Sequence, residues 1–343
     1  MPELAIVILN WNGLEFLKKF LGTVLRYSTR PSTEIYVVDN GSSDDSVKWI
    51  IEHFREVKLV RFETNNGFAG GYNIALEQIA AKYYLLLNSD IEVTEGWIEP
   101  LLIHMKNNPG CAACQPRVHS WFRKDFFEYA GASGGYIDKY GYPFCRGRIF
   151  SHIEKDEGQY NDNVRVFWTS GACMMVRSDA WKKCGGFDAS FFAHMEEIDL
   201  CWRFNKAGYS LECVPESFVY HVGGGTLSYN SPYKTYLNFR NSLYMLYKNL
   251  DQNDLRRIMF LRRLLDGIAA LTFLARGHFK SFLSVWRAHM DYNKNLPQLK
   301  VKRSDIQKNT TGYYSLPVLN KSIVFEFYAR GKRTFKSLDL IFK

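Results

Sequence analysis

The chain has 343 residues, of which 46% are hydrophobic and 16% aromatic. This composition excludes an intrinsically disordered protein and is enough for one large or two modest domains. Charge is uneven, because residues 233–343 hold 21 Lys and Arg against 7 Asp and Glu, whereas residues 1–232 hold 23 against 28. A basic excess confined to the last third favours an anionic partner, either nucleic acid or an anionic membrane surface.

Four short apolar segments alternate with helical patterns near the N-terminus. The segments are Leu4–Leu9, Glu34–Val38, Val57–Phe62 and Tyr83–Leu87, and apolar residues recur at helical spacing over 16–25 and 47–54. This alternation predicts a parallel sheet covered by helices. Polar clusters follow three of the strands, beginning at Asn10, Asp39 and Asn88. In such sheets the ligand crevice lies at the carboxyl ends of the strands.

The middle of the chain has a less regular pattern. We expect a buried strand or strand pair in Trp168–Arg177, helices in Ser178–Cys184 and Glu196–Ala207, a final strand in Phe218–Val222, and loops or a hairpin in 131–145. The sequence predicts a catalytic domain in residues 1–232 and a basic, mainly helical extension in 233–343. Arg-rich amphipathic helices of the extension either lie on an anionic membrane or pack on the core with a solvated basic face.

Neither a membrane span nor a disulfide framework is expected. The apolar run Gly267–Ala275 is too short to cross a bilayer, and Leu4–Leu9 reads as a core strand rather than as part of a signal peptide. Seven cysteines scattered singly fit the reducing cytosol. Cys111 and Cys114 form one CxxC, but in an extended strand their side chains would face opposite sides, which argues against a metal or redox site.

Two polar segments could bind a nucleotide. Asp39 could accept hydrogen bonds from a base or ribose, or it could simply belong to an Asp-Asn-Gly turn. The glycine-rich segment 65–73, leading into a helix over Ile74–Ala81, suits close approach of backbone N–H groups to phosphate. Because it matches neither the dinucleotide nor the P-loop pattern, a tight turn is an equal alternative.

Asp90 and His221 are candidate metal ligands. Asp90 with Asn88 resembles an Asp-x-Asp motif in which an amide replaces the first acid, so one carboxylate would need the phosphates of a nucleotide to complete the coordination of a hard cation. His221 could add a nitrogen ligand or could be a structural residue.

Three acids open the helix predicted at residue 196. Asp199 and Arg203 have the i,i+4 spacing of a structural ion pair. Glu197 follows an aromatic pair, and a raised pKa there would suit a general base. Alternatively, the acids only complement the helix dipole.

Taken in order, eight features resemble family-2 glycosyltransferases of the inverting, GT-A type, with the bacterial rhamnosyltransferase-like branch closest. They are VILNWNG, VVDNGSSDDS, NNGFAGGYN, LLLNSD, WTSGACMMVR, GGFDASFF, MEEIDLCWR and the late His221. The resemblance covers roughly residues 4–225 together with Arg240 and Asn241. It implies an α/β fold with the mixed GT-A sheet flanked by helices, followed by the C-terminal helical extension.

The resemblance also implies roles for individual residues. Nucleotide contacts would come from Asn10, Trp11, Asp39, Asn66, Gly67 and Asn88. Asp90 and His221 would hold a divalent metal, Mg²⁺ or Mn²⁺, with the donor diphosphate. Glu197 would be the base, with Glu196 as the alternative, and the acceptor side would comprise Trp168, Ser170, Gly171 and Asp188. The chain departs from the family pattern at Asn88, usually an acid, and at Glu197, usually an aspartate.

These roles imply a transferase that moves a sugar from dTDP-rhamnose or a UDP-hexose to the hydroxyl of a saccharide or lipid-linked saccharide during cell-surface polysaccharide synthesis. We expect a cytoplasmic protein, peripheral on the inner face of the plasma membrane. A nucleotidyltransferase or a nucleotide-sugar-binding protein of the same fold is the alternative. The loop from Asn10 to Gly13 lacks the basic residue that a nucleotidyltransferase needs. Nucleic acid is not expected as a partner, since the basic tail shows no recognition motif.

Overall fold

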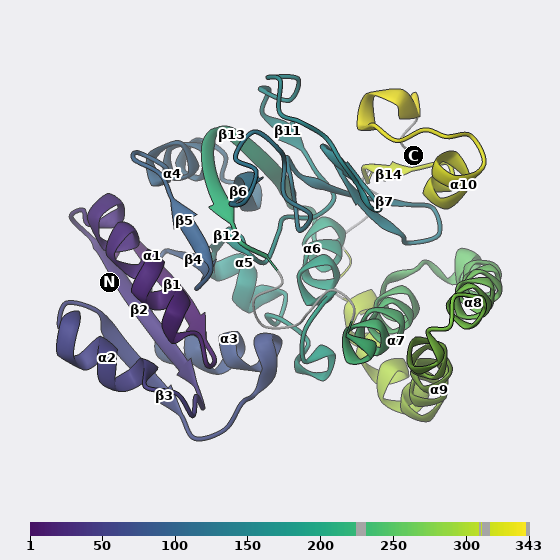
Figure 1. Cartoon of the computed structure of the whole chain (residues 1–343), viewed down its shortest axis with the longest axis horizontal. Coiled ribbons are helices and arrows are strands. Elements are labelled where there is room, and N and C mark those ends of the chain that lie inside the picture. The colour runs from purple at the N-terminus through teal and green to yellow at the C-terminus, as the bar shows by residue number, and fades with distance from the viewer. Residues whose placement is uncertain (224–230, 309, 311–315, 341–343) are drawn as a thin grey trace.

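A β-sheet lies at the centre of the fold (Figure 1). The computed structural model describes residues 1–223, 231–308, 310 and 316–340. Within them the strand order is β11-β13-β6-β12-β4-β1-β2-β3, and β5 pairs with β13. These strands are β1 (Leu4–Asn10), β2 (Thr33–Asn40), β3 (Lys58–Phe62), β4 (Tyr83–Asn88), β5 (Ile91–Val93), β6 (Cys111–Ser120), β11 (Val164–Arg165), β12 (Cys173–Arg177) and β13 (Ser210–His221).

The sheet is mixed. β1 pairs in parallel with β2 and β4, and β2 pairs in parallel with β3, as the alternation predicts. β12 runs antiparallel to β4 and β6. The parallel arrangement predicted from the alternation is confirmed for the four strands that carried it, whereas β12 is antiparallel because a small second sheet, rather than a crossover helix, connects β6 to β12. The mixed sheet that the resemblance implies is confirmed.

Helices cover both faces of the sheet. In β1, Leu4 and Ile6 enter a core shared with α1 and α4, whereas Ala5 and Val7 enter a second core shared with α3, α5 and α6. Burial on both faces explains why the strands read as continuous apolar runs. The helices of this part are α1 (Leu14–Ser28), α2 (Ser46–His53), α3 (Gly67–Gln78), α4 (Ile98–Asn107), α5 (Ser178–Lys183), η1 (Ala189–Phe191) and α6 (Glu196–Lys206).

The C-terminal part continues the second core. Buried Leu246, Tyr292 and Leu299 belong to the same apolar cluster as Phe204 of α6. The boundary predicted after residue 232 thus falls at the start of α7, while the apolar core extends through it. The elements here are α7 (Pro232–Asn249), α8 (Gln252–Ala275), α9 (Phe279–Lys308), α10 (Ile323–Tyr328) and η2 (Phe335–Leu338).

The second sheet has the order β10-β9-β8-β7-β14. Its β7–β8 pair is an antiparallel hairpin, which is one of the two forms predicted for residues 131–145. The C-terminal strand β14 pairs with β7, so the last third of the chain returns to the part that precedes α7. The strands are β7 (Gly135–Asp138), β8 (Pro143–Cys145), β9 (Arg148–Ile149), β10 (His152–Ile153) and β14 (Val318–Leu319).

Candidate active site

The ends of β1 and β2 bring the first two candidate residues together. Asn10 and Asp39 are register partners, both buried, and the Asn10 amide nitrogen lies 3.5 Å from the Asp39 carboxylate. Asp39 also accepts a hydrogen bond of 3.2 Å from the backbone N–H of Ser42. Trp11 is 40% exposed at the same edge. An acidic acceptor and an exposed ring therefore stand side by side at the carboxyl edge of the sheet.

Residues 67–73 of the glycine-rich segment belong to α3, which begins at Gly67, so the segment is not a loop leading to a helix at Ile74. Gly67 has a φ of +72°, and a Cβ there would come within 2.6 Å of Phe192. The N–H groups of Phe68 and Ala69 donate to the Phe192 carbonyl at 2.7 and 3.1 Å. Those two N–H groups therefore hold the segment before α6 instead of facing a phosphate. The Asn66 N–H donates to Asn40, whose own amide donates to the Gly67 carbonyl.

Asp90 and His221 lie in contact at the ends of β4 and β13. His221 Nε2 is 3.1 Å from Asp90 Oδ1, and its Nδ1 is 3.2 Å from Glu128 Oε2. All three side chains are buried. Burial disfavours the imidazolium, but the two carboxylates outweigh it and raise the pKa of His221 well above its usual range. Burial raises the pKa of Asp90, yet His221 lowers it further, so that it lies below the ordinary value.

The segment before α6 is strained. Phe192, His194 and Met195 all have positive φ, between 64° and 72°, which non-glycine residues rarely adopt. Asn241 of α7 donates from its amide to the carbonyls of Phe191, Ala193 and His194 at 2.8–3.0 Å. The helical extension therefore holds the turn that sets the start of α6.

Glu196 and Glu197 lie at that start. Burial raises the pKa of Glu197 to about 7, although nearby backbone N–H groups oppose the rise. Burial, followed by the neighbouring Glu197, raises the pKa of Glu196 well above its ordinary value. In each residue the Oε2 atom is buried without a hydrogen-bond partner among the described residues. A carboxylate that titrates near neutrality suits proton abstraction.

Gly171 lies between Glu197 and the strand end that precedes Asp90. A Cβ on Gly171 would lie 3.5 Å from the Glu197 Cβ, so the two residues are in close proximity. The next residue, Ala172, accepts a hydrogen bond of 2.9 Å from the N–H of Asn88, which precedes Asp90 by two positions. The glutamates and Asp90 therefore flank one short stretch of chain.

Three residues predicted for the acceptor side have structural contacts. Trp168 is buried and donates from Nε1 to the Tyr136 carbonyl at 3.0 Å. Ser170 is buried and its N–H donates to Gln115. Asp188 is held by Lys248 at 2.6 Å and by Lys302 at 2.5 Å. These contacts hold the three side chains in place, whereas the fourth predicted residue, Gly171, adjoins Glu197.

The Asp199–Arg203 ion pair predicted from i,i+4 spacing is present at 3.0 Å. Asp199 is fully buried and also binds Lys248 at 3.0 Å and the Asn249 amide at 2.8 Å. Lys248 thus bridges Asp188 and Asp199. Sequence reasoning missed Glu128 and Lys248, because no local pattern marks a partner that lies far away in the chain.

The CxxC residues lie at the opposite end of β6 from His221. Ser210 pairs with Cys111 and Leu211 with Ala113, so Ala112 is an extra residue in β6 and both cysteines enter the same core. Their predicted opposite orientation is therefore wrong.

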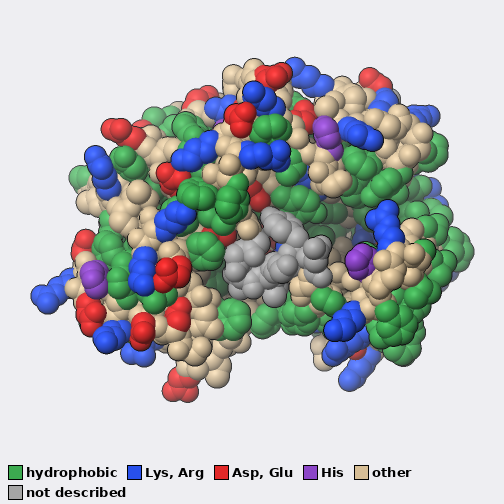
Figure 2. Space-filling model, viewed as in Figure 1, with side chains coloured by type: hydrophobic (Ala, Val, Ile, Leu, Met, Phe, Trp, Pro, Cys, Tyr) green, Lys and Arg blue, Asp and Glu red, His purple; other side chains and the backbone are tan. Residues whose placement is uncertain are grey.

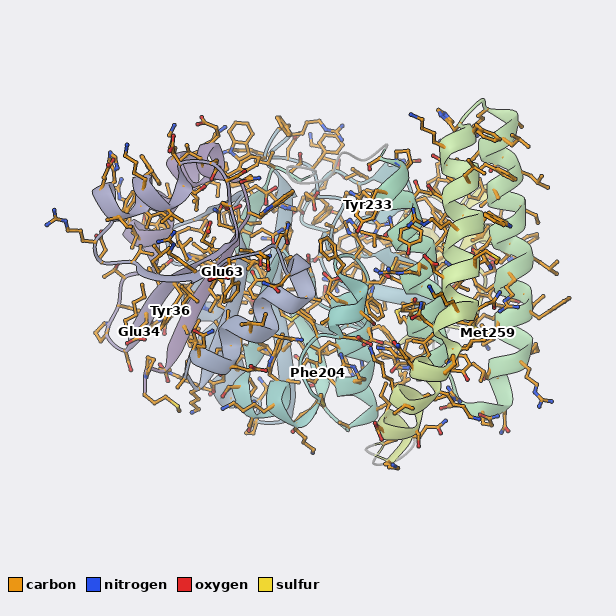
Figure 3. The ribbon with its side chains drawn as sticks, turned by 90° about the horizontal axis from the view of Figure 1, so that it is seen from below. Glu34, Tyr36, Glu63, Phe204, Tyr233 and Met259 are labelled. Atoms are coloured by element: carbon orange, nitrogen blue, oxygen red, sulfur yellow. The ribbon has the colours of Figure 1, made fainter. Side chains whose placement is uncertain are left out.

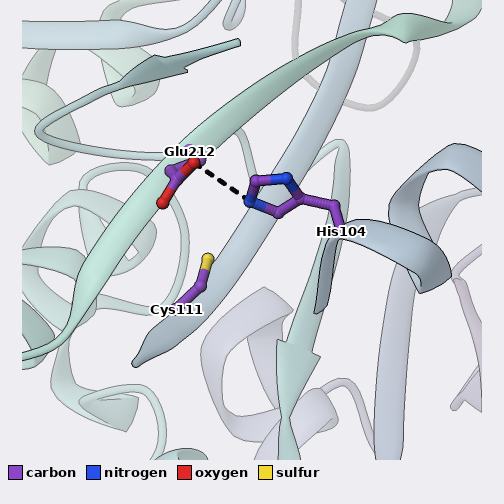
Figure 4. Close-up of side chains that lie close together, drawn as sticks. All are labelled: His104, Cys111 and Glu212. Atoms are coloured by element: carbon purple, nitrogen blue, oxygen red, sulfur yellow. Dashed lines mark ion pairs between the residues drawn. The ribbon is translucent and has the colours of Figure 1, made fainter. Parts of the chain in front are cut away.

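Cys111 lies near the ion pair of His104 and Glu212, whose Nε2 and Oε2 are 3.0 Å apart (Figure 4). Burial raises the pKa of the Cys111 thiol to about 12, and the thiol donates to the Ala113 carbonyl at 3.3 Å. The thiol therefore hydrogen-bonds to the backbone and not to the ion pair, and the cluster takes no part in the candidate active site.

Comparison with known proteins places these features in context. The model of Glycosyl transferase family 2 matches residues 5–185. An N-acetylglucosaminyl-diphospho-decaprenol L-rhamnosyltransferase of Mycobacterium tuberculosis is 26% identical over 236 residues, which are 64% of this chain and 75% of that protein. The low-salt glycan biosynthesis hexosyltransferase Agl10 of Haloferax volcanii is 24% identical over 70% of this chain and 74% of its own length.

Two solved structures share the fold. GalNAc-T7 with UDP, GalNAc and Mn²⁺ has a TM-score of 0.59 at 16% identity, over 92% of this chain and 59% of that one. S. aureus TarS 1–349 has a TM-score of 0.56 at 14% identity, over 96% of this chain and 92% of that one. The resemblance predicted from residues 4–225 is thus confirmed for the family and the fold, although 224 and 225 lie outside the described residues.

Proposed function

Because this chain belongs to Glycosyl transferase family 2 and has the GT-A fold, we propose that it transfers a sugar from a nucleotide-diphosphate donor to a saccharide hydroxyl with inversion. One observation carries this mechanism. Glu197, with a pKa of about 7, adjoins Gly171. The residue after Gly171, Ala172, accepts a hydrogen bond from the N–H of Asn88, which precedes Asp90 by two positions. An acid–base group and a phosphate-side carboxylate are therefore positioned at one edge of the sheet.

The donor nucleotide binds at the ends of β1 and β2 in this proposal. Asp39 accepts hydrogen bonds from the pyrimidine base, Trp11 offers its exposed ring for stacking, and Asn10 orients Asp39. Asn66, Gly67 and Asn88 line the same edge. A dTDP-linked rhamnose and a UDP-linked hexose both satisfy these contacts.

Asp90 and His221 fit a divalent metal. Their ligand atoms are 3.1 Å apart, close to the spacing of two adjacent ligands that each lie about 2.1 Å from one ion. Glu128 beside Nδ1 would leave Nε2 of a neutral His221 free to bind. An oxygen and an imidazole nitrogen favour Mn²⁺ over Mg²⁺. When bound, the ion would neutralise charge on the departing nucleotide diphosphate.

Glu197 removes the proton from the attacking hydroxyl of the acceptor. A single displacement by that hydroxyl inverts the anomeric configuration. The buried Glu196 keeps its proton in this proposal, because its pKa is also raised and two adjacent carboxylates resist joint ionisation. The strained turn before α6, held by Asn241, fixes where the base points.

The acceptor is a saccharide or a lipid-linked saccharide used in cell-surface polysaccharide synthesis. This assignment is supported by the names of the Mycobacterium tuberculosis and Haloferax volcanii relatives. We accordingly place the enzyme at the inner face of the plasma membrane as a peripheral protein. In the described part of the chain no helix has the length and apolar character required to cross a bilayer.

The test measures thermal stabilisation by UDP, dTDP, GDP and CMP with and without Mn²⁺, followed by transfer assays with the matching sugar nucleotides. A metal-dependent shift with UDP or dTDP is expected. Asp39→Ala should abolish the shift, whereas Asp45→Ala, at an exposed carboxylate beyond the same strand, should retain it. Stabilisation by none of the four nucleotides in the folded protein would refute the proposal.

A further inference from the structure

The outer face of α8 carries a stripe of exposed apolar side chains. Phe260, Ile268 and Leu271 are 64%, 58% and 62% exposed, and they recur at helical spacing. The complete stripe is Phe260, Leu264, Ile268, Leu271 and Leu274. Side chains of this size rarely gather on a free surface in a soluble monomer. The stripe therefore needs a partner.

The neighbouring helix α9 carries a second stripe. Trp286 is 61% exposed, and it lies among further exposed apolar residues at helical spacing. This stripe comprises Phe279, Leu283, Trp286 and Met290. Figure 3 shows the two helices side by side as the outermost layer, with side chains pointing away from the core, and Figure 2 shows hydrophobic side chains gathered at the same edge of the molecule.

The two helices form an antiparallel pair, in which Arg263 donates to Asn293 at 2.9 Å and His289 lies 3.2 Å from Asp266. On each helix these contact residues lie to one side of the stripe, and the buried residues lie opposite it. Helical geometry therefore places both stripes on the same side of the pair, where they form one surface. We call this surface the α8–α9 face.

Positive charge borders the α8–α9 face. The exposed cations are Arg256, Arg257, Arg263, Arg276, Lys280 and Arg287. Between Leu255 and Met290 the only acidic residue is Asp266, which is fully buried and paired with Arg262 at 2.9 Å. At the two ends of this stretch Asp254 pairs with Arg257 at 2.7 Å and Asp291 lies 3.9 Å from Arg287. An apolar face bordered by more cations than acids complements the interface of an anionic bilayer. A second copy of the chain would bring the same cations against these.

The α8–α9 face begins near the candidate active site. Phe273, near the end of α8, packs on Phe239 of α7, with ring centroids 6.5 Å apart. Phe239 and Phe192 both pack against the small cluster of Tyr236, Leu237 and Ala288, and Phe192 precedes Glu196 by four residues. The end of α8 therefore packs on α7, the helix whose Asn241 holds the strained segment before α6.

From these observations we propose that the α8–α9 face docks on an anionic lipid surface, with its apolar side chains in the interfacial layer and its cations at the headgroups. This inference deepens the proposed function, since it names the surface through which the enzyme reaches a lipid-linked acceptor. Docking itself requires neither donor nor acceptor.

The experiment is flotation of the full-length protein with phosphatidylcholine vesicles and with vesicles that also contain phosphatidylglycerol. Wild type should float with the anionic vesicles only, and less in high salt. A double variant, Leu271→Glu with Trp286→Glu, should bind at least about tenfold more weakly. Replacing Lys280 and Arg287 with serine should lower the affinity for anionic vesicles by about fivefold per cation.

The matched control is Ile103→Glu, which adds a charge at an exposed apolar position on α4. It should bind like wild type, and all variants should show wild-type circular dichroism and melting. Failure of the wild type to float, or equal flotation of the double variant, would overturn the inference. So would a dimer in solution that the double variant dissociates without altering flotation. Flotation without any glycosyl transfer would refute the proposed function alone.

Discussion

Glu197→Gln should stop catalysis and also stabilise the fold at alkaline pH. The amide cannot accept the hydroxyl proton, so transfer should fall by about 10²–10⁴-fold while donor binding stays within a few-fold. In wild type, activity should rise with pH around a midpoint of about 7, because only the ionised form of Glu197 is a base. Glu196→Gln should retain transfer.

The stability effect follows from the same carboxylate. Its pKa is about 7 in the fold against an ordinary 4.5, and each pKa unit is worth about 1.4 kcal/mol. A raised folded-state pKa contributes stability that is present below pH 4.5 and is lost as pH rises through 7. The free energy of unfolding of the wild type should thus fall by up to about 3 kcal/mol between pH 4.5 and 8. Glu197→Gln should not show this decrease.

Urea unfolding at pH 5 and pH 8 measures this difference. Glu77→Gln, which removes an exposed carboxylate on α3, is the control and should follow wild type. If Glu197→Gln transfers sugar at the normal rate, Glu197 is not the base. If its stability changes with pH as in wild type, the assigned burial of the carboxylate is wrong.

Three further outcomes are expected. Asp90→Asn should abolish both transfer and its stimulation by Mn²⁺; normal stimulation would dismiss Asp90 as a ligand. Glu128→Gln should weaken Mn²⁺ affinity about 10–100-fold, measured by calorimetry with nucleotide present, because His221 loses the carboxylate that orients it; unchanged affinity would contradict that role. Lys248→Met should lower the free energy of unfolding by about 3–5 kcal/mol, since it leaves two buried aspartates without their shared cation. Urea unfolding measures this change. A decrease below about 1 kcal/mol, which is the contribution of an exposed ion pair, would contradict the prediction.

Much of the catalytic part was predictable from local patterns. Apolar runs such as Leu4–Leu9 predict strands because burial on both faces requires continuous apolar residues. Polar residues directly after them, Asn10 and Asp39, predict the ligand edge because parallel strands end together. The ordered motifs supplied the family, and the spacing of Asp199 and Arg203 predicted their ion pair.

Other features depended on contacts between distant segments. The helical start of α3 at Gly67 depends on Phe192, more than a hundred residues away, whose carbonyl binds its first N–H groups. The packing roles of Trp168 and Asp188 depend on Tyr136 and Lys248. A motif identifies a residue but not its partner, so these roles could not be read from the motif.

The sequence by itself determined the family, the strand ends that carry the chemistry and the basic character of the last third, because each depends on residue type and short-range spacing. Only the tertiary structure decided that Glu128 contacts His221, that Asn241 holds the strained turn before α6, and that the apolar stripes of α8 and α9 face solvent. These three features depend on which surfaces meet when the helices pack. Contacts between residues far apart in the chain leave no periodic pattern in the sequence.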